Sequence, residues 1–222
     1  MVARSRHFDA DKKVINMQRS CYPIIAALVL LSRVPAFASD PEDPDWPCEQ
    51  ALVAEISAAV VWDGPSVDGL SDQWGSDPDV AALVQRLVAR RIEPADAESL
   101  IEAFAGAQAP ADRDHRLTLL FAGVLDVLNA DRSKLNDGIL RYARDQERRA
   151  RALDDHLAEL VRLEADDSQA ADQRLEELQK RFQIEQRIFD DREKSIPFLC
   201  TSPRVVEQRI GDLARAIAAQ LE

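Results

Sequence analysis

The chain has 222 residues, with 40 Asp or Glu and 28 Lys or Arg, and a formal net charge of −12 at pH 7. This acidity argues against nucleic-acid binding and against electrostatic binding to an anionic membrane face, because both need basic patches. The length is that of one ordinary domain. We therefore expect a single-domain protein whose partners are neither nucleic acids nor lipid surfaces.

Residues 1–38 have the organisation of a secretory signal peptide. Basic residues precede the short apolar run 24–31, and the small-residue pattern Ala36-Phe37-Ala38 follows it. We predict cleavage between Ala38 and Ser39 and a periplasmic or secreted location. The apolar run is too short to cross a ~30 Å bilayer core, so we expect no membrane embedding after cleavage. Met17 is a candidate for the true start, because it would give a leader of ordinary length.

Two cysteines, Cys48 and Cys200, would remain after cleavage. An even count in an oxidising compartment predicts a disulfide between them, and two free buried thiols are the alternative. The bond would close a loop of about 150 residues, for which the chain-entropy model gives about 4–5 kcal/mol. The sequence has no Cys-x-x-Cys, so neither a dithiol redox centre nor a c-type haem is predicted.

Residues 39–77 form an acidic, irregular arm, interrupted by proline and glycine. The arm holds all three tryptophans of the chain, Trp46, Trp62 and Trp74. Clustered Trp in such a segment can mark an interaction surface or line a ligand pocket. Trp is also highly buried on average, and we favour the interpretation that the rings fix the arm to a helical core.

Residues 78–132 are predicted to form that helical core. Asp77-Pro78 and Glu93-Pro94 each place proline at the first helical position behind a capping residue. A third helix is expected over 112–129. Its run Leu117–Leu125 is apolar nearly all round, which is typical of a buried helix.

We interpret residues 129–135 as the turn and N-cap that begin the next helix. The segment superficially resembles the start of a calcium-binding loop. Lys134 stands where such a loop needs glycine, and Leu140 stands where it needs a bidentate glutamate. A calcium site is therefore not predicted.

Residues 133–197 show a heptad seam in two arms, with seam positions spaced alternately by four and three residues. The break between the arms lies near 164–168, with Asp167 or Ser168 available to cap the second arm. Two long helices joined by a short turn pack antiparallel. Folding about this turn places Tyr142 near Phe189 and Gln146 near Glu185.

Residues 198–222 are predicted to form a last helix, capped by Thr201-Ser202-Pro203. It is expected to pack back on the core through an apolar stripe made of Val205, Val206, Ile210, Leu213, Ile217 and Leu221. No convincing strand pattern occurs. The expected fold is all-α: a small helical core, a long antiparallel helical hairpin, the irregular Trp-containing arm and one disulfide.

The residue types needed for known reactive centres are scarce. Beyond the leader only His115 and His156 remain and there is no methionine, which excludes copper sites built from His and Met and histidine-rich zinc sites. Neither a Gly-x-Ser-x-Gly motif nor a phosphate-binding glycine loop is present. No cofactor, metal ligand or catalytic residue is predicted. The abundant carboxylates leave open whether the chain is an enzyme.

The sequence favours an exported helical accessory or adaptor protein that contacts another envelope protein. Self-association through the hairpin is a related expectation. The alternative is a helical domain, enzymatic or binding a small ligand, with a pocket lined by Trp46, Trp62 and Trp74.

Overall fold

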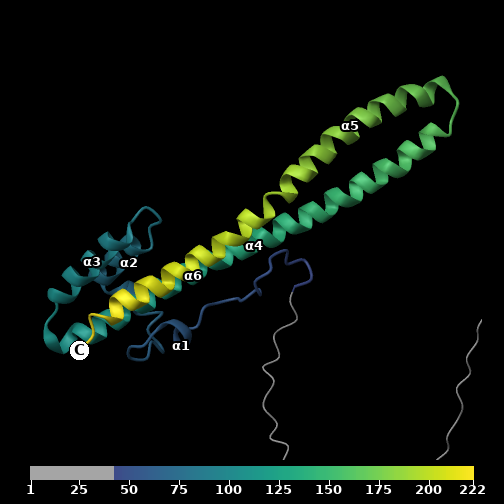
Figure 1. Ribbon diagram of the computed structural model, residues 1–222. Helices are drawn as coiled ribbons and strands as arrows, with labels where there is room; N and C mark the ends of the chain where they lie inside the picture. Colours follow the sequence, from purple (N-terminus) through teal and green to yellow (C-terminus); the bar gives the residue numbers. More distant parts are fainter. Residues whose placement is uncertain (1–42) are drawn as a thin grey trace, which may run out of the picture. The chain divides into compact units, whose positions relative to one another are not determined.

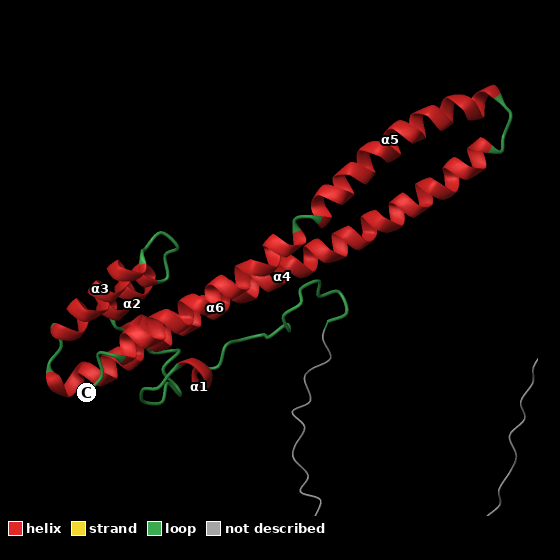
Figure 2. Cartoon of the chain, in the orientation of Figure 1, coloured by secondary structure: helices red, strands yellow, loops and turns green. Residues whose placement is uncertain are grey.

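The computed structural model describes residues 43–222, and this part of the chain is helical with no strand (Figures 1 and 2). The all-α prediction is confirmed over these residues. None of the helices found there is long and apolar enough to cross a membrane. The predicted signal peptide and the first residues of the arm lie outside the described residues.

The arm carries only short helical turns, α1 (Ala58–Val61) and the 3-10 turn η1 (Trp74–Ser76). The core helices α2 (Pro78–Leu87) and α3 (Pro94–Gly106) begin at the two predicted prolines. The Asp77 carboxylate accepts hydrogen bonds from the first free backbone N–H groups of α2, as an N-cap residue should.

Helix α4 (Pro110–Glu164) is a single helix of 55 residues, so the predicted turn at 129–135 is wrong. The boundary expected between core and hairpin at 132/133 falls inside this helix. Asn129 uses its side-chain amide to bind the arm rather than to cap a helix, and therefore does not compete for the α4 backbone. The apolar run Leu117–Val124 is buried, as predicted.

Helix α5 (Gln169–Glu193) begins at Ser168, whose hydroxyl accepts a hydrogen bond from Ala171 N–H, so this predicted cap is confirmed. Helix α6 (Ile196–Ala218) starts earlier than predicted and runs through Thr201-Ser202-Pro203. Proline inside a helix removes one backbone hydrogen bond, and its ring clashes with the carbonyl group four residues before it. The Pro203 ring is fully buried, so its apolar packing against the core acts against this cost.

Helix α4 is the common partner of the long helices. Helix α6 lies along its first half and α5 along its second half (Figure 1). The core lies where α2 and α6 pack on α4 and α3 packs on α6, around the fully buried Phe121, Leu117 and Ile210. A Cβ atom on Gly123 would lie only 2.7 Å from Val84 and 2.8 Å from the Trp74 ring, so this glycine permits their close approach.

The predicted heptad seam is recognisable in the burial pattern of the α4–α5 pair. Seam residues such as Leu153, Leu178 and Phe182 are half-buried, whereas most residues beside them are exposed. The predicted register is wrong by about one helical turn. The Tyr142 hydroxyl donates to Arg192 O at 3.0 Å, and the Gln146 amide donates to Phe189 O at 2.9 Å. These bonds to the α5 backbone set the register, and heptad counting does not include them.

Candidate functional site

The arm is fixed to α4 through its backbone at residues 53–56. The Asn129 amide donates to Ile56 O at 3.0 Å and accepts from Ile56 N–H at 2.9 Å. Arg132, only 2% exposed, donates to the carbonyl oxygens of Val53 and Ala54 and pairs with Glu207 at 2.7 Å. Because Asn129 and Arg132 bind backbone groups of the arm, these contacts depend little on which side chains the arm carries at residues 53–56.

The predicted disulfide joins Cys48 and Cys200. It links the arm to the first turns of α6. Beside it, the Gln50 amide donates to Cys200 O at 2.7 Å, and the Trp46 ring N–H donates to Gln50 O at 2.7 Å. The arm is thus attached covalently at Cys48 and by hydrogen bonds on both sides of it, because Arg144 of α4 also donates to Asp43 and Asp45.

The three tryptophans do not converge on one cavity. The Trp62 ring stacks on Phe121 with centroids 4.1 Å apart, while Trp74 packs at Gly123 and donates to Asp126 at 3.2 Å. Positions 121 and 123 are about 200° apart around a helix, so the two rings contact opposite faces of α4. Trp46 lies instead beside the disulfide. This placement matches rings that fix an arm to a core and gives no geometric support to a shared Trp pocket.

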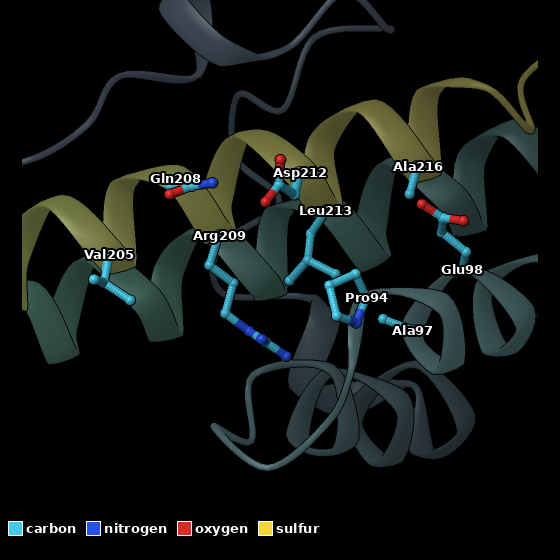
Figure 3. Close-up of a pocket in the computed structure, with 9 residues that line it drawn as sticks. All are labelled: Pro94, Ala97, Glu98, Val205, Gln208, Arg209, Asp212, Leu213 and Ala216. Atoms are coloured by element: carbon cyan, nitrogen blue, oxygen red, sulfur yellow. The ribbon is translucent and has the colours of Figure 1, made fainter.

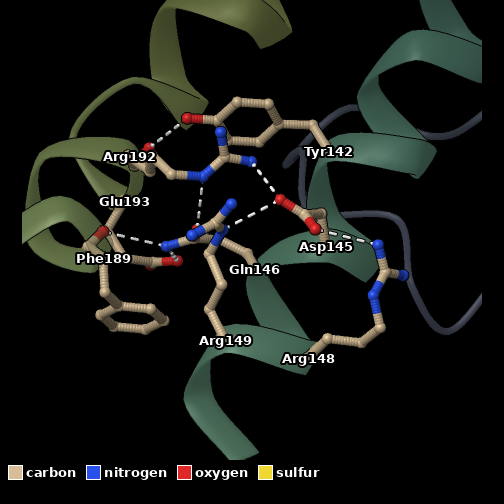
Figure 4. Close-up of polar contacts among 8 residues, drawn as sticks. All are labelled: Tyr142, Asp145, Gln146, Arg148, Arg149, Phe189, Arg192 and Glu193. Atoms are coloured by element: carbon tan, nitrogen blue, oxygen red, sulfur yellow. Dashed lines mark hydrogen bonds and ion pairs between the residues drawn. The ribbon is translucent and has the colours of Figure 1, made fainter. Parts of the chain in front are cut away.

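A polar cluster around the buried Gln146 joins α4 to the end of α5 (Figure 4). Gln146, 3% exposed, donates to Phe189 O and Glu193, each at 2.9 Å, and accepts from Arg192 at 2.9 Å. The Arg192 guanidinium also lies 4.0 Å from the centroid of the Tyr142 ring. The amide of Gln146 is therefore fully used in holding the two helices together.

Asp145 is the carboxylate of this cluster that binds the arginines. It pairs with Arg148, Arg149 and Arg192 at 2.9–3.0 Å. The hydrogen bond from Arg149, together with the charges of the three guanidinium groups, lowers the pKa of Asp145 despite partial desolvation. A carboxylate held ionised in this way is suited to cross-linking helices and poorly suited to proton transfer near neutral pH.

The two histidines lie apart and hold no common site. His115 is on the core half of α4. His156 lies in the seam, with Nε2 2.9 Å from Glu185 Oε2. A hydrogen bond from Arg181 is the main cause of the lowered pKa of Glu185. Over residues 43–222, no three His, Cys, Asp or Glu side chains are grouped so that they could hold a metal ion.

A shallow hollow of about 180 Å³ lies between α3 and α6 (Figure 3). Pro94 and Ala97 of α3 and Leu213 and Ala216 of α6 form its apolar lining. The carboxylates of Glu98 of α3 and Asp212 of α6 lie at its edge.

Arg209 of α6 lines one side of the hollow and binds the backbone at the end of α2. Its guanidinium donates to Leu87 O at 2.5 Å and to Ala89 O at 3.2 Å, at the end of α2. The last carbonyl groups of a helix lack partners within it, so Arg209 satisfies Leu87 O and joins α6 to the α2–α3 connection. Ala89 O also accepts from Ile92 N–H at 3.1 Å.

No family model, no curated protein and no solved structure matches this chain.

The sequence did not predict the polar stripe on α4 that binds the arm, nor the hollow between α3 and α6. Asn129, Arg132 and Asn136 follow a spacing of three and four residues, and this polar stripe beside an apolar helix could have indicated a docked segment. The hollow between α3 and α6 has no sequence signal, because its walls come from distant parts of the chain. Val205, predicted to be part of the buried stripe, is 64% exposed at the hollow.

Proposed function

We propose that the chain is an exported accessory or adaptor protein that acts through protein–protein contacts, chiefly along the α4–α5 hairpin. The observation that carries this proposal is the small contribution of α5 to the core. Of its 25 residues only Ala171 is buried. A helix that adds so little to the hydrophobic core is better explained by a contact role than by stabilisation of the fold.

Exposed aliphatic side chains on both arms support this role. Leu157 and Val161 of α4 are 47% and 63% exposed, and Ile184 and Ile188 of α5 are 61% and 44% exposed. Each pair is four residues apart and so lies on one face of its helix. Single exposed aliphatic residues are ordinary, but paired ones outside the seam give a partner helix apolar surface to pack on.

Export is the second part of the proposal. It rests on the leader-like residues 1–38 and on the Cys48–Cys200 bond, because disulfides persist mainly in oxidising compartments. The partner would then be another envelope protein. The experiment must distinguish binding to such a partner from self-association of this chain through the same aliphatic pairs.

The test is site-specific photo-crosslinking of the full chain in its native cell, with the photoreactive residue at Glu177, which is exposed on α5 two turns before Ile184 and on the same face of the helix. We expect one defined envelope protein to be crosslinked. The double variants L157S/V161S and I184S/I188S should reduce the crosslink at least tenfold. The control E176S/K180S removes an exposed ion pair on α5, with both side chains 70% exposed, and should leave the crosslink unchanged.

Three results would contradict the proposal. The first is equal crosslinking by the aliphatic and control variants, and the second is a crosslinked product containing only this chain. The third is a protein that keeps residues 1–38 and stays in the cytoplasm, which would contradict the proposed export. Light scattering of the purified chain measures self-association independently.

A further inference from the structure

The hollow between α3 and α6 is the middle part of a longer groove along α6. A second hollow of about 240 Å³ lies between α6 and Leu128 and Leu135 of α4, and shares Val205 and Arg209 with the first. A third, more open hollow continues toward Gln220 and shares Glu98 and Asp212 with the first. The shared residues show that the three hollows are consecutive.

The lining of the groove follows one face of α6. Its residues Val205, Arg209, Asp212 and Ala216 are spaced by four, three and four positions, which places them on one stripe of the helix. From Thr201 to Gln220 the three hollows span about 30 Å at 1.5 Å per residue. That length matches an opposing helix of about 20 residues.

The groove has the surface of an unoccupied helix-packing site. Val205 is 64% exposed, and Phe198, two turns earlier on α6, is 76% exposed. The two better-enclosed hollows, of about 180 and 240 Å³, are smaller than the ~300–1,000 Å³ of typical small-molecule sites. They have the size for individual side chains of a partner.

The charges at the α3 end of the groove select the partner. Glu98 and Glu102 line it and form no ion pair with any residue in 43–222. Arg209 is engaged by the carbonyl groups at the end of α2, and Arg215 pairs with Asp212 at 2.5 Å. With Glu98, Glu102 and Asp212 against Arg209 and Arg215, the lining at this end carries a formal charge of −1, and its two unpaired carboxylates are those of Glu98 and Glu102.

We propose that this groove binds an amphipathic helix of a partner protein. Aliphatic side chains of that helix, spaced at i, i+3 or i+4 and i+7, enter the hollows, and its Lys or Arg residues lie over Glu98 and Glu102. This second surface goes beyond the hairpin proposal and does not depend on it.

The test uses the full disulfide-bonded chain and a fluorescein-labelled amphipathic helical peptide of Leu and Lys about 18 residues long, measured by fluorescence anisotropy. A peptide of Leu and Glu with the same spacing is the control probe. We expect the Leu/Lys peptide to bind at least tenfold more tightly than the Leu/Glu peptide. Val205→Ser and the double variant E98K/E102K should each weaken its binding at least fivefold.

Matched variants separate groove binding from general attraction to an acidic protein. The double variant E164K/D167K makes the same change in net charge at the hairpin tip and should alter binding less than twofold. The I184S/I188S variant should also leave binding unchanged, so the two proposals can fail separately. Circular dichroism verifies that every variant is folded.

Equal weakening by E98K/E102K and E164K/D167K would overturn the proposal, as would similar affinity for both peptides. Sedimentation analysis supplies a further test. A dimer of the chain that Val205→Ser disrupts would show that a second copy occupies the groove, and would overturn the assignment to a basic partner helix.

Discussion

Polar side chains on α4 decide how the rest of the chain is arranged around it. Arg132 binds two carbonyl groups of the arm and Glu207 of α6, while Gln146 binds the backbone and side chains of α5. Buried polar groups are costly unless they are hydrogen-bonded, so each of these residues favours one arrangement of its neighbours. The positions of the arm, α5 and α6 on α4 therefore depend on a few such polar residues as well as on apolar packing.

Asp77 gives a pH-dependent prediction. Two hydrogen bonds from Arg116, at 2.7 and 2.9 Å, are the main cause of a pKa below its ordinary value of 3.8. A lowered folded-state pKa contributes stability that is present above the unfolded value and is lost as pH falls through the folded value. The Asp77→Asn variant retains a capping oxygen but loses the charge. It should be about 1–2 kcal/mol less stable than wild type at pH 7.

Urea unfolding between pH 7 and pH 2 measures this difference, which should shrink steadily below about pH 4. Asp79→Asn is the control. The Asp79 side chain is 78% exposed and lies 3.2 Å from Arg116, farther than Asp77, so its substitution should have a smaller effect on stability. A difference between wild type and Asp77→Asn that stays constant down to pH 2 would contradict the role given to the Asp77 charge.

At the scale of helices, local signals located the beginnings of α2, α3 and α5, and that of α4 to within two residues, but they wrongly placed a break inside α4 and the start of α6 too late. Caps and first-turn prolines act through neighbouring backbone groups, so their effect is visible in sequence. Asn129 and Pro203 carry the same local signals inside continuous helices, where contacts with the arm and the core outweigh them. Tertiary contacts routinely override such local preferences.

The hairpin should be separable from the core. Between residues 150 and 186 only Ala171 is buried, so replacing this segment with a short Gly-Ser linker removes little core packing. We expect the shortened protein to unfold cooperatively, with a free energy of unfolding within about 1–2 kcal/mol of wild type. Denaturant unfolding followed by Trp fluorescence measures this directly, since all three tryptophans remain.

A shortened protein without a cooperative transition would mean that the hairpin stabilises the core. Excising the groove-lining residues 208–216 of α6 provides the contrasting case. That segment contains the buried Ile210, Leu213 and Ala214, and its loss should abolish folding.

At the scale of the whole molecule, the Cys48–Cys200 bond links residues 152 positions apart. The double variant C48S/C200S should lose up to about 4–5 kcal/mol of stability, because closing so long a loop restricts the unfolded chain. Urea unfolding with and without reductant measures the loss. Reductant should lower the midpoint of the wild type and leave that of the variant unchanged.

A wild-type midpoint that does not change on reduction, with reduction verified by mass, would contradict this expectation. Limited proteolysis adds a local measurement. Cleavage within residues 43–56 should be faster without the bond, because only non-covalent contacts, among them the hydrogen bonds from Asn129 and Arg132, would then hold this segment.

The sequence alone determined the helical class, the cysteine pair, most helix starts and the seam of the hairpin. These depend on periodicity, capping and composition, which act over a few residues or follow from counting. The tertiary structure alone decided the continuity of α4, the hairpin register, the separation of the tryptophans and the groove along α6. Each depends on contacts between residues far apart in the chain, such as Asn129 with Ile56 or Gln146 with Phe189, and no local pattern encodes such pairings.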